Sequence, residues 1–389
     1  MNGFTFAATP QLHFGAGKIS MLSGITQTYG NNVLLVTGAQ AFERLPWGAS
    51  IRQQLDVPER EVLHYRIDGE PTPTMIDDAV RRYAGQGIHV VVAIGGGSVL
   101  DAGKAISAML PLNEPVKDYL EGVGTRATHP GVKIPFIAVP TTAGTGSEAT
   151  KNAVISEVGE HGYKRSLRHN NFVPDVALID PILTVTCPPA TTAASGMDAF
   201  TQLLESYLST AATPLTDAWA MEGLQHVAKA LPTAYQHGDN IEARSSMALA
   251  ACLSGVTLAN AGLGVVHGYA SAVGGYVAIP HGVVCSTLMT AANRVTVRKL
   301  LAGGGEEALG RYAAVGKLFT GQSSKSDRYY IDHLLTTIET WAADMQIPGL
   351  GAYGVTRADV GRMVAVTDNK NNPVKLNAEE LAEVLEDSL

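Results

Sequence analysis

The sequence predicts an α/β nucleotide-binding domain with a parallel sheet, followed by an all-α domain. In the first half, short β-branched runs alternate with helical patterns, which is typical of a parallel sheet covered by helices. In the second half, strand signals almost vanish and long segments rich in Ala, Leu, Met and Glu follow. The 389 residues suffice for two domains with a cleft between them. We therefore place the two domains at 1–183 and 184–389.

The expected strands of the first domain are continuous apolar runs, as in strands that are buried on both faces. They lie at 31–38, 88–97, 133–142 and 174–180. Helical patterns at 74–86 and 98–110 separate them. The N-terminal segment 4–15 alternates in polarity and could form an exposed edge of a sheet.

The second domain is expected to consist of helices joined by short loops. The predicted helices lie at about 191–210, 214–231, 241–261, 263–276, 281–294, 306–318, 328–345 and 355–367. Pro280 marks the start of the helix near 281. The segment LAGGGEEALG (301–310) is the expected flexible loop.

Composition narrows the classes of protein. Hydrophobic residues make up 46% and charged residues 16%, which is typical of a globular chain. The net charge of −8, with no basic block, argues against a nucleic-acid partner. No signal-peptide pattern and no apolar run of the ~20 residues that span a bilayer occur. Three cysteines without a CxxC suit a reducing cytosol, so we expect a cytoplasmic protein with no membrane partner.

Two glycine-rich turns follow predicted strands. In AIGGGSVLDAGKAIS (93–107), Gly96 and Gly97 leave no side chain to block a ligand, and the helix from about Ser98 directs unpaired N–H groups at that gap. A pyrophosphate fits there, although the loop matches neither a Walker A motif nor the common G-x-G-x-x-G fingerprint. A tight turn without a ligand is the alternative.

The second turn, AVPTTAGTGSEAT (138–150), is rich in hydroxyl groups. One interpretation is that these hydroxyls satisfy only their own backbone. Two such turns ending adjacent strands instead favour a shared ligand crevice. The hydroxyl residues concerned are Thr141, Thr142, Thr145 and Ser147.

The segment GMDAFTQLLESY (196–207) places Asp198 and Gln202 four residues apart, on one face of a helix. Phe200 and Leu204 belong to an apolar stripe on the other side, with Glu205 on the polar side. By itself this helix predicts a solvated polar face.

Two histidines, His267 and His281, each precede a glycine and lie among small or apolar residues. Either one alone fits a hydrogen-bonded core histidine. Together with an inward carboxylate they form a usual ligand set for a divalent metal.

Five motifs together resemble the iron-containing alcohol dehydrogenase family in order and spacing over nearly the whole chain. They are GGGSxxDxxK (95–104), PTTAGTGSE (140–148), GMDA (196–199), VVHG (265–268) and PHG (280–282). The resemblance implies the fold shared with dehydroquinate synthase, with a metal and a nicotinamide meeting in the cleft. It implies the metal ligands Asp198, His267 and His281.

The chain departs from the family pattern at two positions of the site. Gln202 stands where the family has a further histidine ligand, and Ser271 stands where many members carry another active-site histidine. The amide oxygen of Gln202 is a weaker donor than imidazole, so we expect a weak fourth ligand. Fe²⁺ is the expected metal, with Zn²⁺ and Mn²⁺ as alternatives.

The predicted cofactor-binding residues come from the two turns and from the resemblance. Gly38 follows a strand at the position where NAD-specific members carry an aspartate, so NADP is expected to be tolerated or preferred beside NAD. Lys164 corresponds loosely to a cofactor-contacting lysine of the family. The full set is Gly38, Gly96, Gly97, Ser98, Asp101, Thr141, Thr142, Thr145, Ser147, Lys151 and Lys164.

The resulting functional prediction is a metal-dependent, NAD(P)-linked alcohol dehydrogenase or aldehyde reductase acting on a small alcohol or aldehyde. In this family the metal acts as a Lewis acid on the substrate oxygen during hydride transfer, and no side chain here stands out as a general base. The alternatives are a metal-free reductase resembling maleylacetate reductases, a dehydroquinate synthase-like lyase and a non-catalytic nucleotide-binding protein. A homodimer or higher even oligomer is expected, since the family commonly pairs subunits through N-terminal strands.

Overall fold

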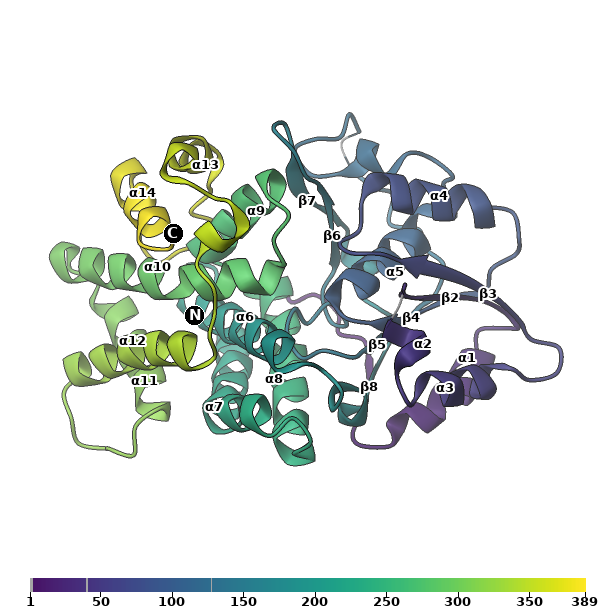
Figure 1. Cartoon of the computed structure of the whole chain (residues 1–389), viewed down its shortest axis with the longest axis horizontal. Helices are drawn as coiled ribbons and strands as arrows, with labels where there is room; N and C mark the ends of the chain where they lie inside the picture. Colours follow the sequence, from purple (N-terminus) through teal and green to yellow (C-terminus); the bar gives the residue numbers. More distant parts are fainter. Residues whose placement is uncertain (1–2, 40, 127) are drawn as a thin grey trace.

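The computed structural model describes residues 3–39, 41–126 and 128–389. Its N-terminal half is built around a parallel sheet and its C-terminal half is helical (Figure 1). The parallel sheet of the first half and the run of helices after it confirm the predicted fold class. The boundary at 183/184 stays a proposal; it falls between the last sheet strand and the first long helix of the helical half.

The main sheet has six parallel strands in the order β1-β8-β5-β4-β2-β3. A separate antiparallel hairpin, formed by β6 and β7, packs against helices of both halves. The strands are β1 (Gln11–Phe14), β2 (Asn32–Gly38), β3 (Glu61–Ile67), β4 (Val90–Gly95), β5 (Phe136–Pro140), β6 (Asn152–Glu157), β7 (Tyr163–Arg168) and β8 (Val176–Ile179).

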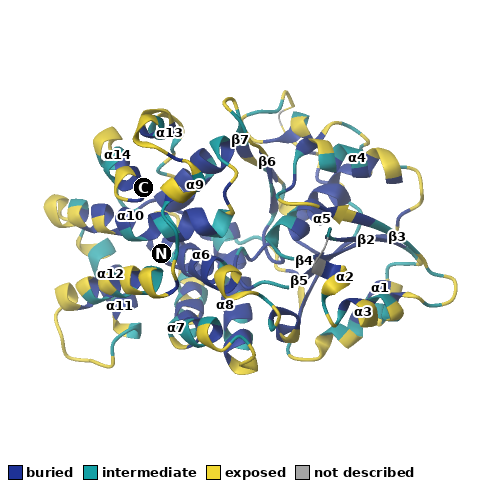
Figure 2. Cartoon of the chain, viewed as in Figure 1, coloured by how far each residue is buried: buried dark blue, intermediate teal, exposed yellow. Residues whose placement is uncertain are grey.

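Helices cover both faces of the sheet, which is why its central strands are apolar throughout (Figure 2). Leu34 and Val36 of β2 pack with α4 and α5 on one face, while Val33 and Leu35 pack with α1 and α3 on the other. The helices of this half are α1 (Leu22–Gln27), α2 (Ala41–Arg44), α3 (Gly48–Leu55), α4 (Pro73–Tyr83) and α5 (Gly97–Met109).

In the helical half, α6 is the central element, since α7, α8, α10 and α11 all pack against it. Its other side faces the sheet half (Figure 1). The helices are α6 (Pro189–Leu208), α7 (Pro214–Gln236), α8 (Ile241–Ala261), α9 (Val265–Tyr276), α10 (His281–Gly303), α11 (Glu306–Leu318), α12 (Asp327–Asp344), α13 (Val360–Val366) and α14 (Ala378–Glu386).

A backbone-to-backbone contact joins the two halves. Gly146, in the turn after β5, has φ +62°, and a Cβ added to Gly255 on α8 would lie 2.1 Å from the Gly146 carbonyl oxygen. No residue with a side chain fits this contact without a shift of the backbone. It therefore holds the hydroxyl-rich turn directly against the helical half.

The structure corrects three details of the predicted elements. The segment 301–310 is not a flexible loop, because α10 runs to Gly303, Gly304 ends it in the left-handed conformation and α11 begins at Glu306. The N-terminal segment forms a strand only at Gln11–Phe14. Strands β3, β6 and β7 and helix α14 were not predicted.

No single described helix combines the length and apolar character needed to cross a membrane. Helices α8 and α9 meet that criterion only jointly, as a pair bent by 97°.

Candidate active site

A cleft between the two halves gathers most of the predicted site residues. The residues that line it from the glycine-rich turns are Gly97, Ser98, Asp101, Thr145 and Ser147, and those from the helical half include Gln202, His267, Ser271 and His281. The predicted nucleotide turns and the predicted metal ligands thus face one space.

The first turn has the geometry of an anion-binding helix start. Strand β4 ends at Gly95, Gly96 is the N-cap of α5 without a side-chain cap, and a Cβ added to Gly97 would lie 2.6 Å from Thr145 Oγ1. Because Gly97 has no side chain, the two turns can touch. The first N–H groups of α5 have no partner within the helix and are free to bind a pyrophosphate.

Asp101 and Lys104, both in the first turn motif, support the second turn from inside. Asp101 accepts hydrogen bonds from the Ser147 hydroxyl and from Val154 N. The buried Lys104 amine donates to Ser147 O, Thr150 Oγ1 and Asn152 O at 2.7–2.8 Å, and burial lowers its pKa to about 8. These bonds fix the loop around the cleft.

The remaining predicted cofactor residues lie at different distances from the cleft. Lys164 of β7 lines it and pairs with both carboxylate oxygens of Glu70 at 2.7 Å. Lys151 does not line it, and its amine donates to Asn170 Oδ1. Thr141, Thr142 and Gly38 are half-buried at the ends of β5 and β2, outside the lining of this cleft.

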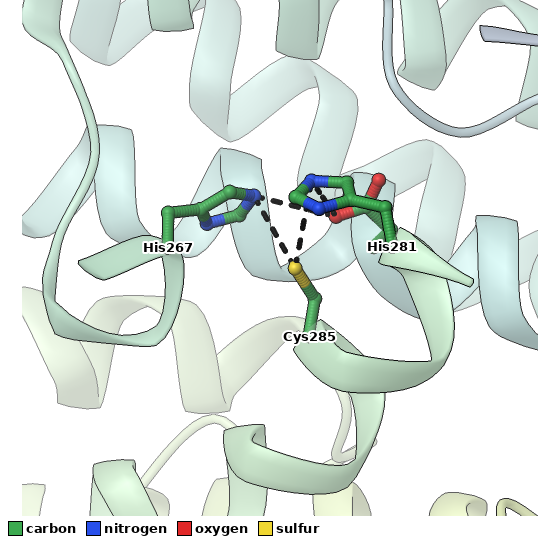
Figure 3. A group of neighbouring side chains, drawn as sticks. His267, His281 and Cys285 are labelled. Atoms are coloured by element: carbon green, nitrogen blue, oxygen red, sulfur yellow. Dashed lines mark hydrogen bonds and ion pairs between the residues drawn. The ribbon is translucent and has the colours of Figure 1, made fainter. Parts of the chain in front are cut away.

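The second group of the cleft is a cluster of four potential metal ligands. One ligand atom from each of Asp198, His267, His281 and Cys285 lies within 4.8 Å of every other one. Asp198 Oδ1 is 3.3 Å from His267 Nε2 and 3.9 Å from His281 Nε2. Figure 3 shows both imidazole rings and the Cys285 sulfur directed toward a common point.

The polar groups of the cluster fit a cation. Asp198 is fully buried, yet its Oδ1 accepts no hydrogen bond among the described residues. Burial by itself would lower the pKa of His267, but the neighbouring side chains of Cys285, Asp198 and Glu205 raise it well above its usual value. The negative groups beside His267 would also favour a divalent cation, while burial lowers the pKa of the neighbouring His281 and so favours its neutral ring.

Glu205 orients His267. Its Oε2 lies 2.7 Å from His267 Nδ1 and its Oε1 accepts the backbone N–H of Val266 at 2.7 Å. With Nδ1–H donated to the carboxylate, Nε2 faces the cluster, where its lone pair would bind a metal that replaces the proton.

The prediction of a solvated polar face on α6 is wrong. Asp198, Gln202 and Glu205 are 0%, 1% and 7% exposed, because α8 and α10 pack against α6 and the start of α9 lies over Glu205. Gln202 Nε2 donates to Asp198 Oδ2 at 3.2 Å, and its Oε1 accepts from Ser254 Oγ.

Sequence reasoning missed Cys285 and Glu205. The pattern of three cysteines without a CxxC gives Cys285 no role, although it follows His281 by four residues and so shares its helix face. Glu205 was assigned to solvent. The periodicity of α6 does not reveal that the start of α9 reaches Glu205 and hydrogen-bonds to it through Val266 and His267.

Comparison with known proteins identifies the family. The model described as iron-containing alcohol dehydrogenase matches residues 9–181, and the C-terminal model of the same family matches residues 192–389. The chain belongs to the iron-containing alcohol dehydrogenase family. The resemblance inferred from the motifs is thereby confirmed, as is the alcohol dehydrogenase function.

Named relatives of this iron-containing alcohol dehydrogenase cover almost its whole length. It is 36% identical to the probable alcohol dehydrogenase EutG of Escherichia coli, over 92% of this chain and 86% of that protein. It is 31% identical to the 1-propanol dehydrogenase PduQ of Salmonella typhimurium, over 99% and 100%. The solved 1,3-propanediol oxidoreductase superposes with a TM-score of 0.88 at 29% identity, covering 100% of both chains. A sulfoacetaldehyde reductase from Bifidobacterium kashiwanohense, solved with NAD⁺, gives 0.86 at 25% identity, over 100% of this chain and 99% of that one.

Proposed function

We propose that this dehydrogenase binds a divalent metal through Asp198, His267 and His281 and interconverts a small alcohol and its aldehyde with NAD(H) or NADP(H). The observation that supports this is the position of the ligand cluster, which opens into the same cleft as the glycine turn at Gly97. The fourth ligand position has two candidates, the amide of Gln202 and the sulfur of Cys285.

The metal supplies Lewis acidity at the substrate oxygen, and the nicotinamide supplies or accepts the hydride. The chain supplies position and environment. The N-terminus of α5 binds the coenzyme pyrophosphate, Glu205 keeps His267 Nε2 directed at the metal, and the buried walls of α6 and α10 exclude water.

Ser271 is not a general base in this scheme. It lines the cleft, but its hydroxyl donates to the His267 carbonyl oxygen at 3.1 Å and so supports the backbone of α9. We propose that the proton leaves through a ribose hydroxyl of the coenzyme and water.

The choice of coenzyme, metal and substrate is proposed from Gly38, from the family and from the named relatives. Gly38 offers no carboxylate to repel a 2′-phosphate, which supports use of NADP(H) as well as NAD(H). Fe²⁺ is the family's metal, and Zn²⁺ or Mn²⁺ also suit nitrogen and oxygen donors. Relatives named for 1-propanol and methanol support a short alcohol as the substrate. We also propose a cytoplasmic homodimer or higher even oligomer.

The lyase alternative finds little support in the cleft. A phosphorylated acidic substrate needs several free basic groups, but Lys104 is buried with three acceptors, and two of the basic side chains that line the cleft are paired, Lys164 with Glu70 and Arg168 with Glu121. Among the described lining residues this leaves Lys370 as the basic side chain without a carboxylate partner.

The deciding experiment is anaerobic purification followed by metal analysis and a screen of NADH and NADPH oxidation with short aldehydes. We expect about one divalent metal per chain, aldehyde reduction that a chelator removes, and recovery on adding Fe²⁺, Mn²⁺ or Zn²⁺. His267→Ala should abolish metal-dependent activity. If the wild type and His267→Ala both kept full activity after treatment with a chelator, the metal-free reductase would be favoured instead.

A further inference from the structure

Cys285 stands beside the proposed metal ligands without a place in the family's ligand pattern. It lies on α10 one turn after His281, and its sulfur is 3.6 Å from His267 Nε2 and 3.7 Å from His281 Nε2 (Figure 3). The residue is fully buried, so solvent does not draw the thiol away from the two rings.

These separations match the edges of a metal coordination shell. A tetrahedral site with metal–nitrogen or metal–oxygen bonds of about 2.1 Å and a metal–sulfur bond of about 2.3 Å has ligand–ligand edges of roughly 3.4–3.6 Å. The two sulfur–nitrogen distances are 3.6 and 3.7 Å, and Asp198 Oδ1 lies 3.3 and 3.9 Å from the two imidazoles. These four edges are close to those of a coordination shell, and the remaining two are no longer than 4.8 Å.

Gln202 is committed to other partners. Its amide N–H donates to Asp198 Oδ2, and its oxygen accepts from the Ser254 hydroxyl. The amide N–H is therefore held by Asp198 Oδ2, and the Gln202 oxygen shares the single hydrogen of the Ser254 hydroxyl with the Ala251 carbonyl oxygen, which lies closer, at 2.7 Å. Asp198 Oδ1 stays unpaired and adjoins the ring nitrogens. In this arrangement Gln202 orients the aspartate instead of replacing the missing histidine.

A second buried cysteine shows what a purely structural thiol looks like in this chain. Cys252 on α8 packs among Ala149, Ala177, Ile179 and Val256, in an apolar cluster between the sheet and the helical half. It is not one of the four clustered ligands, whereas Cys285 is.

We propose that Cys285 is the fourth metal ligand, taking the place that a histidine occupies in the family, and that Gln202 is a positioning residue for Asp198. The proposal rests on the proposed metal-dependent function. A thiolate is a softer donor than imidazole, so the site should favour Zn²⁺ over Fe²⁺ and Mn²⁺ more strongly than an all-nitrogen-and-oxygen site does.

The first test uses the intact wild-type protein loaded with Zn²⁺ and X-ray absorption at the zinc edge. We expect one sulfur neighbour at about 2.3 Å beside nitrogen and oxygen neighbours at about 2.0–2.2 Å. A shell of nitrogen and oxygen alone would overturn the assignment of Cys285 but leave the proposed function intact. A protein that takes up no divalent metal would overturn the proposed function itself.

The second test replaces the metal with Co²⁺ and compares Cys285→Ser with the matched control Cys252→Ser. The wild type and the control should show the intense near-ultraviolet thiolate-to-cobalt charge-transfer band, and Cys285→Ser should lose it. Loss of a residue that only hydrogen-bonds to a metal ligand lowers metal affinity by about 10- to 100-fold. Because Cys285 is proposed as a ligand itself, the Zn²⁺ affinity of Cys285→Ser should fall by more than this. An unchanged band and affinity in a folded Cys285→Ser protein would refute the ligand role.

Discussion

At the scale of the residue, the hydrogen bond between Glu205 and His267 fixes the orientation of a proposed metal ligand. The carboxylate holds Nδ1 of the ring at 2.7 Å and at the same time accepts the N–H of Val266, at the start of α9. Because the carboxylate is anchored to the backbone, the ring cannot rotate freely about its side-chain torsions. The orientation of Nε2 toward Asp198 is therefore built in before any metal binds.

Removing this anchor should loosen the metal without removing a ligand. We expect Glu205→Ala to lower divalent-metal affinity by about 10- to 100-fold, and Glu205→Gln to lower it less, since the amide oxygen still accepts a hydrogen bond. A competition titration against a chelator measures both changes. Glu222→Gln on the exposed side of α7 serves as the control, and equal affinities in all four proteins would contradict the role of Glu205.

Gln202 yields a prediction that separates orientation from ligation. We expect Gln202→Ala to weaken metal binding by about 10- to 100-fold, as loss of a partner of Asp198 does. Because Cys285 completes the proposed ligand shell, Gln202→His should not tighten Fe²⁺ binding, whereas a gain of about tenfold, or about 1.4 kcal/mol, would indicate that the side chain at 202 reaches the metal. Anaerobic Fe²⁺ titration of the three proteins decides. If neither variant differs from the wild type, Gln202 only fills space.

At the scale of the element, the sequence predicted those strands that are buried on both faces, because they form continuous apolar runs. The central strands β2, β4, β5 and β8 are apolar throughout and were found, whereas β3 was missed, because its edge position leaves Glu61, His64 and Arg66 as polar interruptions. The helices of the second half were located by their periodicity. The periodicity did not predict which helices contact each other, and it is these contacts that bury Glu205 and Gln202.

The end of β2 is expected to set the coenzyme preference. Gly38 has open space beside it, since an added Cβ would meet only Val99 Cγ2 at 3.8 Å, so Gly38→Asp fits without repacking. The new carboxylate should bond the ribose hydroxyls of NADH and repel the 2′-phosphate of NADPH. We expect the ratio of kcat/KM values to move toward NADH. Wild-type preference for NADH by more than about a hundredfold, roughly 2.7 kcal/mol, would refute the proposed use of NADPH.

The turn after β5 is expected to make stability depend on pH. Burial raises the pKa of Glu148 to about 7, above its ordinary 4.5. Between these values the folded protein binds more protons than the unfolded chain, so this group's contribution to stability declines as pH rises from about 4.5 to 7. Urea midpoints at pH 5 and pH 8 should therefore differ more for the wild type than for Glu148→Gln. The exposed Glu160→Gln is the control, and an equal pH response of wild type and Glu148→Gln would contradict the prediction.

At the scale of the whole molecule, the active site exists only because the two halves meet. The glycine turns come from the sheet, the ligands come from α6, α9 and α10, and the contact of Gly146 with Gly255 fixes their separation. The motifs predicted that these groups belong together. Only the packed structure shows that the hairpin of β6 and β7 also reaches the cleft, through Lys164.

The outer edge of the sheet is where we expect a second copy of the chain. Strand β1 pairs with β8 on one side only, and within the described residues no strand pairs with its other side, where Leu12 is 46% exposed. Gln11 N and Gly15 N donate toward β8, so by the alternation of a strand the N–H of Leu12 points outward, free to pair with a partner.

Leu12→Pro tests this directly, because proline removes the outward N–H and leaves the bonds from Gln11 and Gly15 to β8 intact. We expect a dimeric or higher even mass for the wild type by light scattering at micromolar concentration, and a monomeric mass for Leu12→Pro. Leu12→Val, which keeps the N–H and suits a strand, should remain associated. A monomeric wild type would refute assembly altogether, while an unchanged oligomer of Leu12→Pro would place the subunit contact on another surface than the edge of β1.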